Sequence, residues 1–183
     1  VATGPGGMTD YERGIFEAAA KASVATGAPI TTHTDQGTAG DLQQQVLTGG
    51  GVPAHRIVVG HSCGTSDGAY HMKIARGGSY LGFDRFGLEM LQPDAERVAA
   101  LARLVEGGAG RHVVVSHDSV WCWRGQPFPK EIYDAAVQVW NPSHFFERVV
   151  PQLRERGVTE AQIEALLVEN PRAFFAGEKP SAG

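Results

Sequence analysis

Four short apolar runs, each ending in a polar residue and each followed by a helical stretch, constrain the fold of this chain most. The runs are APITTH (28–33), RIVVGH (56–61), SYLGFDR (79–85) and HVVVSHD (112–118). Strands that are apolar along almost their whole length are typical of parallel sheets, which are buried on both faces. The pattern therefore predicts an α/β fold built on a parallel sheet.

The polar strand ends recur at intervals that fit one strand and one helix each. His33, His61, Asp84 and Asp118 follow one another at spacings of 28, 23 and 34 residues, as in an α/β barrel or a doubly wound sheet. A Rossmann sheet needs a G-x-G-x-x-G turn after its first strand, and none of the runs is followed by one. The spacing therefore favours a TIM barrel. Because a closed barrel has eight strands and about 250 residues, four units make half of one.

Helix start and stop signals lie between the runs. A capping box at 9–12 opens a helix that Gly27 is placed to end. A second capping box at 159–162 opens a late helix that we expect to end at Asn170–Pro171. Between Trp121 and Asn141 the sequence predicts a long connection, which at the mouth of a barrel usually carries function.

Composition excludes several classes of protein. The chain has 183 residues, 42% hydrophobic and 20% charged, as in globular domains. A net charge of −4 without a basic stripe argues against nucleic acid, and no apolar run approaches the roughly 18 residues of a membrane span. Cys63 and Cys122 are too few for a disulfide framework, so we expect free thiols and a cytoplasmic protein. Since the chain begins at Val1 rather than Met, we expect a fragment of a longer protein.

Three of the strand-end side chains are of metal-binding types. The carboxyl ends of barrel strands converge on one mouth, so His33, His61 and Asp118 should lie together. Imidazole and carboxylate groups suit zinc, iron, cobalt or manganese, and a metal with open positions lowers the pKa of bound water to about 7. A single His after a strand is more often a packing residue, and His117 should point away from the mouth because side chains alternate along a strand.

The strand ends also carry a resemblance to a known family. The segments ITTHT (30–34), VGHS (59–62), LGFDRFG (81–87) and SHD (116–118) resemble, in order and spacing, strands five to eight of the phosphotriesterase family in the amidohydrolase superfamily. The likeness extends over nearly the whole chain. It implies that residues 1–183 are the C-terminal half of a single (β/α)8 barrel domain of a metal-dependent hydrolase.

The resemblance implies a cofactor of two divalent metal ions, with zinc favoured over cobalt, iron or manganese. His33 and His61 would bind one metal. Asp118 would bind the other and accept a proton from the metal-bound hydroxide as it attacks. A carboxylated lysine that bridges the metals, and a His-x-His pair, are expected just upstream of Val1.

The resemblance also bears on the substrate. In the lactonase branch of the family an Arg at the position of Arg85 lies at the substrate mouth, whereas phosphotriesterases proper have His there. Trp123 is expected to form a wall for a leaving group or acyl chain. We therefore expect a hydrolase that opens lactones, acyl-homoserine lactones among them, and promiscuously hydrolyses organophosphate esters.

Two alternatives and an oligomeric state stay open. One alternative is a dedicated phosphotriesterase, and the other is a non-catalytic barrel relative. The second is favoured only by Gly64, where the family often has an acidic residue, while nearby Asp67 is expected to cap a helix or act as a remote partner. A homodimer is not excluded by any feature of the sequence.

Overall fold

The four apolar runs form one parallel sheet, seen in a computed structural model that describes residues 1–120, 125 and 129–180. The strands are β1 (Ile30–Thr31), β2 (Ile57–Val59), β3 (Tyr80–Phe83) and β4 (Val113–Val115), and they lie side by side in this order. Each strand pairs in parallel with the next one along the chain. Stepwise parallel pairing is what a barrel segment requires, because each crossover leads to the adjacent strand. The predicted α/β class is confirmed.

The first residues of the chain extend this sheet beyond β1. The Thr3 N–H donates to the His33 carbonyl at 3.1 Å, and the His33 N–H donates to the Val1 carbonyl at 2.8 Å. Ala2 forms a parallel bridge with His33. Residues 1–3 therefore lie where a preceding parallel strand would lie, which matches the predicted half barrel.

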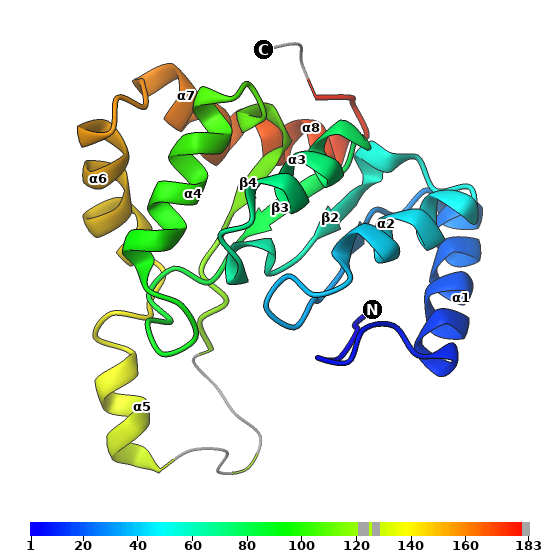
Figure 1. Ribbon diagram of the computed structural model, residues 1–183, viewed down its shortest axis with the longest axis horizontal. Coiled ribbons are helices and arrows are strands. Elements are labelled where there is room, and N and C mark those ends of the chain that lie inside the picture. Colours follow the sequence, from blue (N-terminus) through cyan, green and yellow to red (C-terminus); the bar gives the residue numbers. More distant parts are fainter. Residues whose placement is uncertain (121–124, 126–128, 181–183) are drawn as a thin grey trace.

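Helices connect the strands, and most of them lie along the sheet, whereas the helix Lys130–Ala136 lies away from it (Figure 1). α1 (Asp10–Thr26) leads into β1, and α2 (Gly40–Gly49), α3 (Gly68–Arg76) and α4 (Asp94–Glu106) follow β1, β2 and β3 in turn. The later helices are α5 (Lys130–Ala136), α6 (Val150–Glu155), α7 (Glu160–Glu164) and α8 (Asn170–Ala176). Short 3₁₀ turns span Ala54–Arg56, Ser62–Gly64 and Gly110–His112, and π turns span Phe145–Val149 and Ala165–Glu169. Among the described residues, no helix combines the length and apolar content that crossing a membrane requires.

The core lies between the sheet and these helices. Alternate strand residues such as Val59 and Leu81 are fully buried in one large apolar cluster with helix residues such as Phe16 and Leu101. The strand residues between them, such as Val58 and Tyr80, face the other side of the sheet and form a smaller cluster with Phe174 of α8. The sheet is thus buried on both faces, as its apolar runs predict.

Both capping boxes are confirmed, and the predicted end of the late helix is wrong. Thr9 and Thr159 each accept a hydrogen bond from the residue three positions on, and Gly27 ends α1 in the left-handed conformation. The late helix does not end at Asn170–Pro171, because a π turn carries the chain directly into α8, which has Pro171 in its first turn. The connection expected between Trp121 and Asn141 contains α5, which follows the extended backbone at Pro129.

Candidate metal centre

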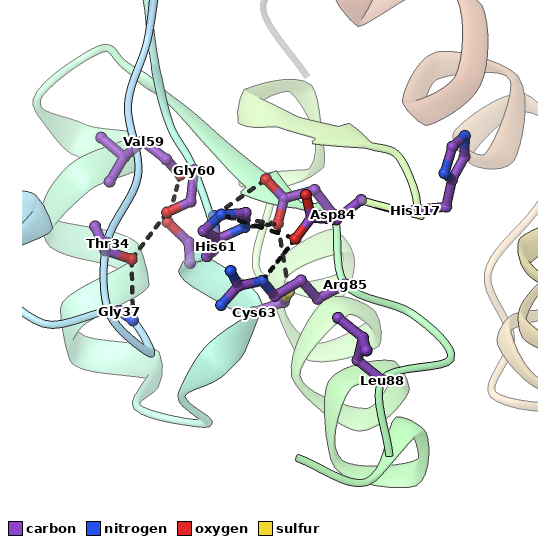
Figure 2. Close-up of polar contacts among 12 residues, drawn as sticks. Thr34, Gly37, Val59, Gly60, His61, Cys63, Asp84, Arg85, Leu88 and His117 are labelled. Carbon is purple, nitrogen blue, oxygen red and sulfur yellow. Dashed lines mark hydrogen bonds and ion pairs between the residues drawn. The ribbon is translucent and has the colours of Figure 1, made fainter. Parts of the chain in front are cut away.

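Five polar side chains gather at the carboxyl end of the sheet. His33, His61, Asp84, Arg85 and Asp118 each follow a strand within three residues. Parallel strands direct these ends to one side, so residues far apart in the sequence meet there. Figure 2 shows the cluster around His61 and Asp84.

The structure brings the three predicted ligands to one place. The imidazole rings of His33 and His61 lie edge to face, with their centroids 4.5 Å apart at an interplanar angle of 88°. His61 Nε2 lies 4.0 Å from Asp118 Oδ2. Two atoms that bind one metal at about 2.0–2.2 Å lie no more than about 4.4 Å apart, so this distance is near the upper limit for a shared ion.

The three side chains do not by themselves enclose one ion. Within the part of the chain that the structure describes, no group of three His, Cys, Asp or Glu side chains lies close enough to hold a metal. The donor types nevertheless fit a divalent ion, because two imidazoles and a carboxylate stand at one strand-end mouth. The described residues therefore offer suitable donors but do not complete a ligand set.

Asp84 orients the His61 ring, a role that the sequence analysis did not assign. Asp84 Oδ1 lies 2.9 Å from His61 Nδ1, and both carboxylate oxygens accept from the His61 backbone N–H at 3.1 Å (Figure 2). Since an ionised carboxylate only accepts, Nδ1 carries the proton and the lone pair is on Nε2. Carboxylates commonly orient metal-binding imidazoles in this way. The sequence feature that could have indicated this role is the position of Asp84 at the end of a predicted strand.

The backbone at two predicted ligands is strained. His61 has φ 57° and Asp118 has φ 50°, in the left-handed region that costs non-glycine residues about 1–3 kcal/mol. Next to His61, a Cβ on Gly60 would lie 2.0 Å from the Thr32 carbonyl oxygen, so only glycine fits there. Strain of this kind clusters at functional sites, where the surrounding fold holds it in place.

Arg85 pairs with the predicted base across the mouth. Its Nε donates to Asp118 Oδ2 at 3.0 Å, and this contact joins the ends of β3 and β4. The Arg85 side chain is only 13% exposed, whereas that of Asp118 is 38% exposed. Arg85 is therefore held within the mouth, and Asp118 is open to a ligand from outside.

Burial sets the charge state of the His33 side chain. Removal from water lowers the pKa of His33, and the electrostatic effects of the neighbouring His61 and Arg85 side chains lower it further, against the opposing effect of Asp118. The imidazole is thereby kept neutral at neutral pH, which is the form that binds metals.

The Cys63 thiol is not suited to be a ligand. Burial, followed by the charge of Asp84, raises the pKa of Cys63 to about 12. Because metals bind the thiolate, this thiol stays a weak donor, 3.8 Å from Asp84 Oδ1. The prediction of a free thiol is confirmed for Cys63. Cys122 lies outside the described residues, as does the predicted substrate wall Trp123.

Three further residues test smaller expectations of the sequence analysis. His117 accepts from the Ser119 N–H at 3.0 Å and lies apart from the cluster in Figure 2, as strand alternation predicts. A Cβ on Gly64 would lie 2.5 Å from the Cα of Gln36, so this backbone leaves no room for an acidic side chain there. Asp67 caps α3 by accepting from the N–H groups of Ala69 and Tyr70.

Known proteins resemble the chain in sequence and in fold. A phosphotriesterase homology protein of Mycobacterium tuberculosis is 38% identical over 175 residues, which cover 95% of this chain and 53% of that protein. The aryldialkylphosphatase of Saccharolobus solfataricus is 34% identical over 173 residues, covering 94% and 55%. A mutant PTE-like lactonase from Deinococcus radiodurans superposes with a TM-score of 0.88 at 39% identity, covering 96% of this chain and 56% of that structure.

The chain spans about half the length of the curated relatives that it matches. The match lies over the four strands and over the strand-end residues described above. Residues 1–175 match the family model described as the phosphotriesterase family, which is nearly the whole chain. The chain therefore belongs to the phosphotriesterase family.

Proposed function

We propose that the full-length protein is a metal-dependent hydrolase that opens lactones, acyl-homoserine lactones among them, and hydrolyses organophosphate triesters more slowly. Residues 1–183 would be the C-terminal half of its single barrel domain. The observation that carries this proposal is the Arg85–Asp118 pair, which stands beside two imidazoles at the strand-end mouth. The names of two relatives, a PTE-like lactonase and an aryldialkylphosphatase, support the two substrate classes.

The proposed cofactor is a pair of divalent metal ions, with zinc favoured over cobalt, iron or manganese. His33 and His61 would hold one ion and Asp118 the other. A carboxylated lysine preceding Val1 would bridge them. Such ions polarise an ester oxygen and lower the pKa of water.

The side chains of this chain divide the remaining work. Asp118, half open to the mouth, would accept the proton of the attacking water, as a positioned carboxylate does in general base catalysis. Asp84 would keep His61 in the tautomer with Nε2 free. Arg85 would fix the Asp118 carboxylate through Nε and direct its remaining donors at the carbonyl or ring oxygen of the ester.

Replacement of Arg85 tests this assignment in the full-length protein. Arg85→Ala should lower kcat/KM for lactones by more than tenfold, about 1.4 kcal/mol of transition-state stabilisation, with the metal content unchanged. Arg85→Lys should restore little activity, because an ammonium group lacks the fixed fork of donors.

Three outcomes would contradict the proposal. Loss of metal in Arg85→Ala would make Arg85 a structural residue. An unchanged lactone rate with a reduced phosphotriester rate would favour the dedicated phosphotriesterase. A wild-type protein that binds no metal and hydrolyses neither ester would favour the non-catalytic relative.

A homodimer also stays a prediction, which size-exclusion chromatography with light scattering would test.

A further inference from the structure

Three charged or titratable side chains lie buried together just behind the mouth. Asp94, Arg97 and His144 are 5%, 0% and 8% exposed, and we refer to them as the Asp94 cluster. Asp94 and Arg97 lie in the first turn of α4, whereas His144 lies 50 residues further on, at the start of the π turn Phe145–Val149. None of them is part of the candidate metal centre.

The Asp94 carboxylate joins three segments of the chain. Oδ1 accepts from Arg97 Nη1 at 2.8 Å, and Oδ2 lies 2.6 Å from His144 Nε2. Both oxygens accept from the backbone N–H of Gly87 at 3.0 Å. Since the carboxylate only accepts, the His144 ring donates to it. One buried side chain thus holds the loop after β3, the start of α4 and the segment that enters α6.

On one side the Asp94 cluster fixes the turn that carries Arg85. Arg97 Nη2 donates to the Leu88 carbonyl at 3.0 Å, beside the bond from Gly87 to Asp94. The turn itself is closed by the Leu88 N–H, which donates to the Arg85 carbonyl at 3.2 Å. The backbone on which Arg85 stands is therefore held at two consecutive residues.

On the other side the same region fixes the approach to Asp118. Gly87 has φ +91°, and a Cβ there would lie 2.5 Å from the Val139 carbonyl oxygen, so the two segments are in backbone contact. The indole Nε1 of Trp140 donates to the His117 carbonyl at 2.7 Å, one residue before Asp118. A continuous series of contacts therefore runs from the Asp94 cluster to each partner of the Arg85–Asp118 pair.

We propose that the Asp94 cluster is a positioning device that sets the Arg85–Asp118 contact, with Asp94, Arg97 and His144 as positioning residues. The catalytic consequence rests on the function proposed above. Buried ionic groups are weak evidence for stability but can specify a geometry. Here the geometry is the relative position of the loop after β3 and the loop after β4. Among the described residues, the one ion pair that joins these two loops is Arg85 with Asp118.

A double-mutant cycle in the full-length enzyme tests whether the cluster acts through Arg85. His144→Phe keeps an aromatic ring but removes the donor to Asp94, and should lower kcat for a lactone about tenfold at unchanged metal content. His144→Gln, which can still donate, should stay within about threefold of wild type. In an Arg85→Ala background, His144→Phe should cost less than about twofold, because the contact that it sets is already gone.

His112→Phe serves as the matched control. The His112 ring also bonds a main-chain group, the Ser79 carbonyl at 3.2 Å, but at the opposite end of the sheet. The His112→Phe variant should leave kcat within about twofold of wild type. The proposal would be overturned if His144→Phe lowered kcat in the Arg85→Ala background by the same factor as in wild type. It would also be overturned if His112→Phe lowered kcat as much as His144→Phe does.

Hydrogen exchange provides a readout that does not depend on activity. The Gly87 amide, bonded to Asp94, should exchange at least tenfold faster in His144→Phe than in wild type, and at the wild-type rate in His112→Phe. Unchanged exchange would overturn the proposal even if the enzyme is active. Faster exchange in a protein that hydrolyses neither ester would support the positioning device while refuting the proposed function. If His144→Phe does not fold, Asp94→Asn, which keeps the side-chain volume but replaces one acceptor oxygen with an amide group that cannot accept from His144, carries the same cycle.

Discussion

The two ends of the sheet use polar side chains in different ways. At the amino end, buried side chains bond to main-chain carbonyls, and the side-chain pair of Arg111 with Glu169 is partly exposed. Asn170 donates to the carbonyls of Gly110 and Val113, and His112 contacts that of Ser79. At the carboxyl end, the side chains that directly follow the strands bond to one another: His61 to Asp84, and Arg85 to Asp118.

This difference separates stability from chemistry. A side chain that satisfies a buried carbonyl removes a penalty for unfulfilled hydrogen bonding, and little capacity is left for a ligand. At the carboxyl end, His61 Nε2 and the partly exposed Asp118 keep atoms that a ligand can use, and the backbone there accepts left-handed geometry at both residues. The same division holds for barrels in general, whose upper face carries activity and whose lower face carries stability.

The largest expected effect is at the mouth, in Asp118→Asn. The amide keeps the shape but is a far poorer proton acceptor, so lactone turnover should fall about 10²–10⁴-fold. Because asparagine keeps an oxygen that can accept from Arg85 Nε, the free energy of unfolding of the metal-free protein should change by less than about 1 kcal/mol. Steady-state kinetics and urea unfolding of the full-length protein check both parts. A large loss of stability with little loss of turnover would erase the contrast between the two ends.

The next effect concerns metal affinity. Asp84→Ala removes the carboxylate from His61 Nδ1 and should weaken divalent metal binding about 10–100-fold. Chelator competition with zinc measures this. Asp67→Ala is the matched control, since that carboxylate only caps α3, and it should leave metal affinity unchanged. Equal losses in the two variants would mean that removal of any acidic residue nearby is sufficient.

At the amino end, Asn170→Ala should lower stability and spare turnover. The amide of Asn170 donates to two carbonyls, over 2.9 Å and 2.7 Å, and is 3% exposed. Its loss removes two buried hydrogen bonds, although the Gly110 carbonyl still accepts from the Val113 N–H, at a cost of about 2 kcal/mol. Chemical denaturation should show this loss, while kcat per folded enzyme stays within about twofold of wild type. A tenfold fall in kcat with unchanged unfolding would contradict the assignment of this end to stability.

The smallest effect is a dependence of stability on pH. Burial lowers the pKa of His71 and of His112, so the unfolded chain binds protons at a pH where the folded chain does not. Stability should therefore be fully present above about pH 6.5 and decline as the pH falls below it. Urea midpoints at pH 7.5 and 5.5 test this, and His112→Gln should reduce the difference. A midpoint that rises on acidification would show that the sign is wrong.

The sequence alone determined the α/β class, the strand positions and the residues that meet at the mouth. These follow from local rules, because apolar periodicity defines each strand and parallel strands direct their carboxyl ends to one side. The capping boxes at Thr9 and Thr159 were equally readable, since a cap depends on residues three apart. His33, His61 and Asp118 could therefore be named before any coordinates.

Only the tertiary structure decided which partners these residues have. Asp84 bonds a ring 23 residues away, and Asp94 bonds one 50 residues away. The exclusion of a side chain at Gly64 depends on Gln36, which lies on a different loop. Such contacts depend on how helices and loops pack, which neither spacing nor propensity specifies. For the same reason the π turn before α8 was missed, because it is a shift in hydrogen bonding that leaves no mark in the periodicity.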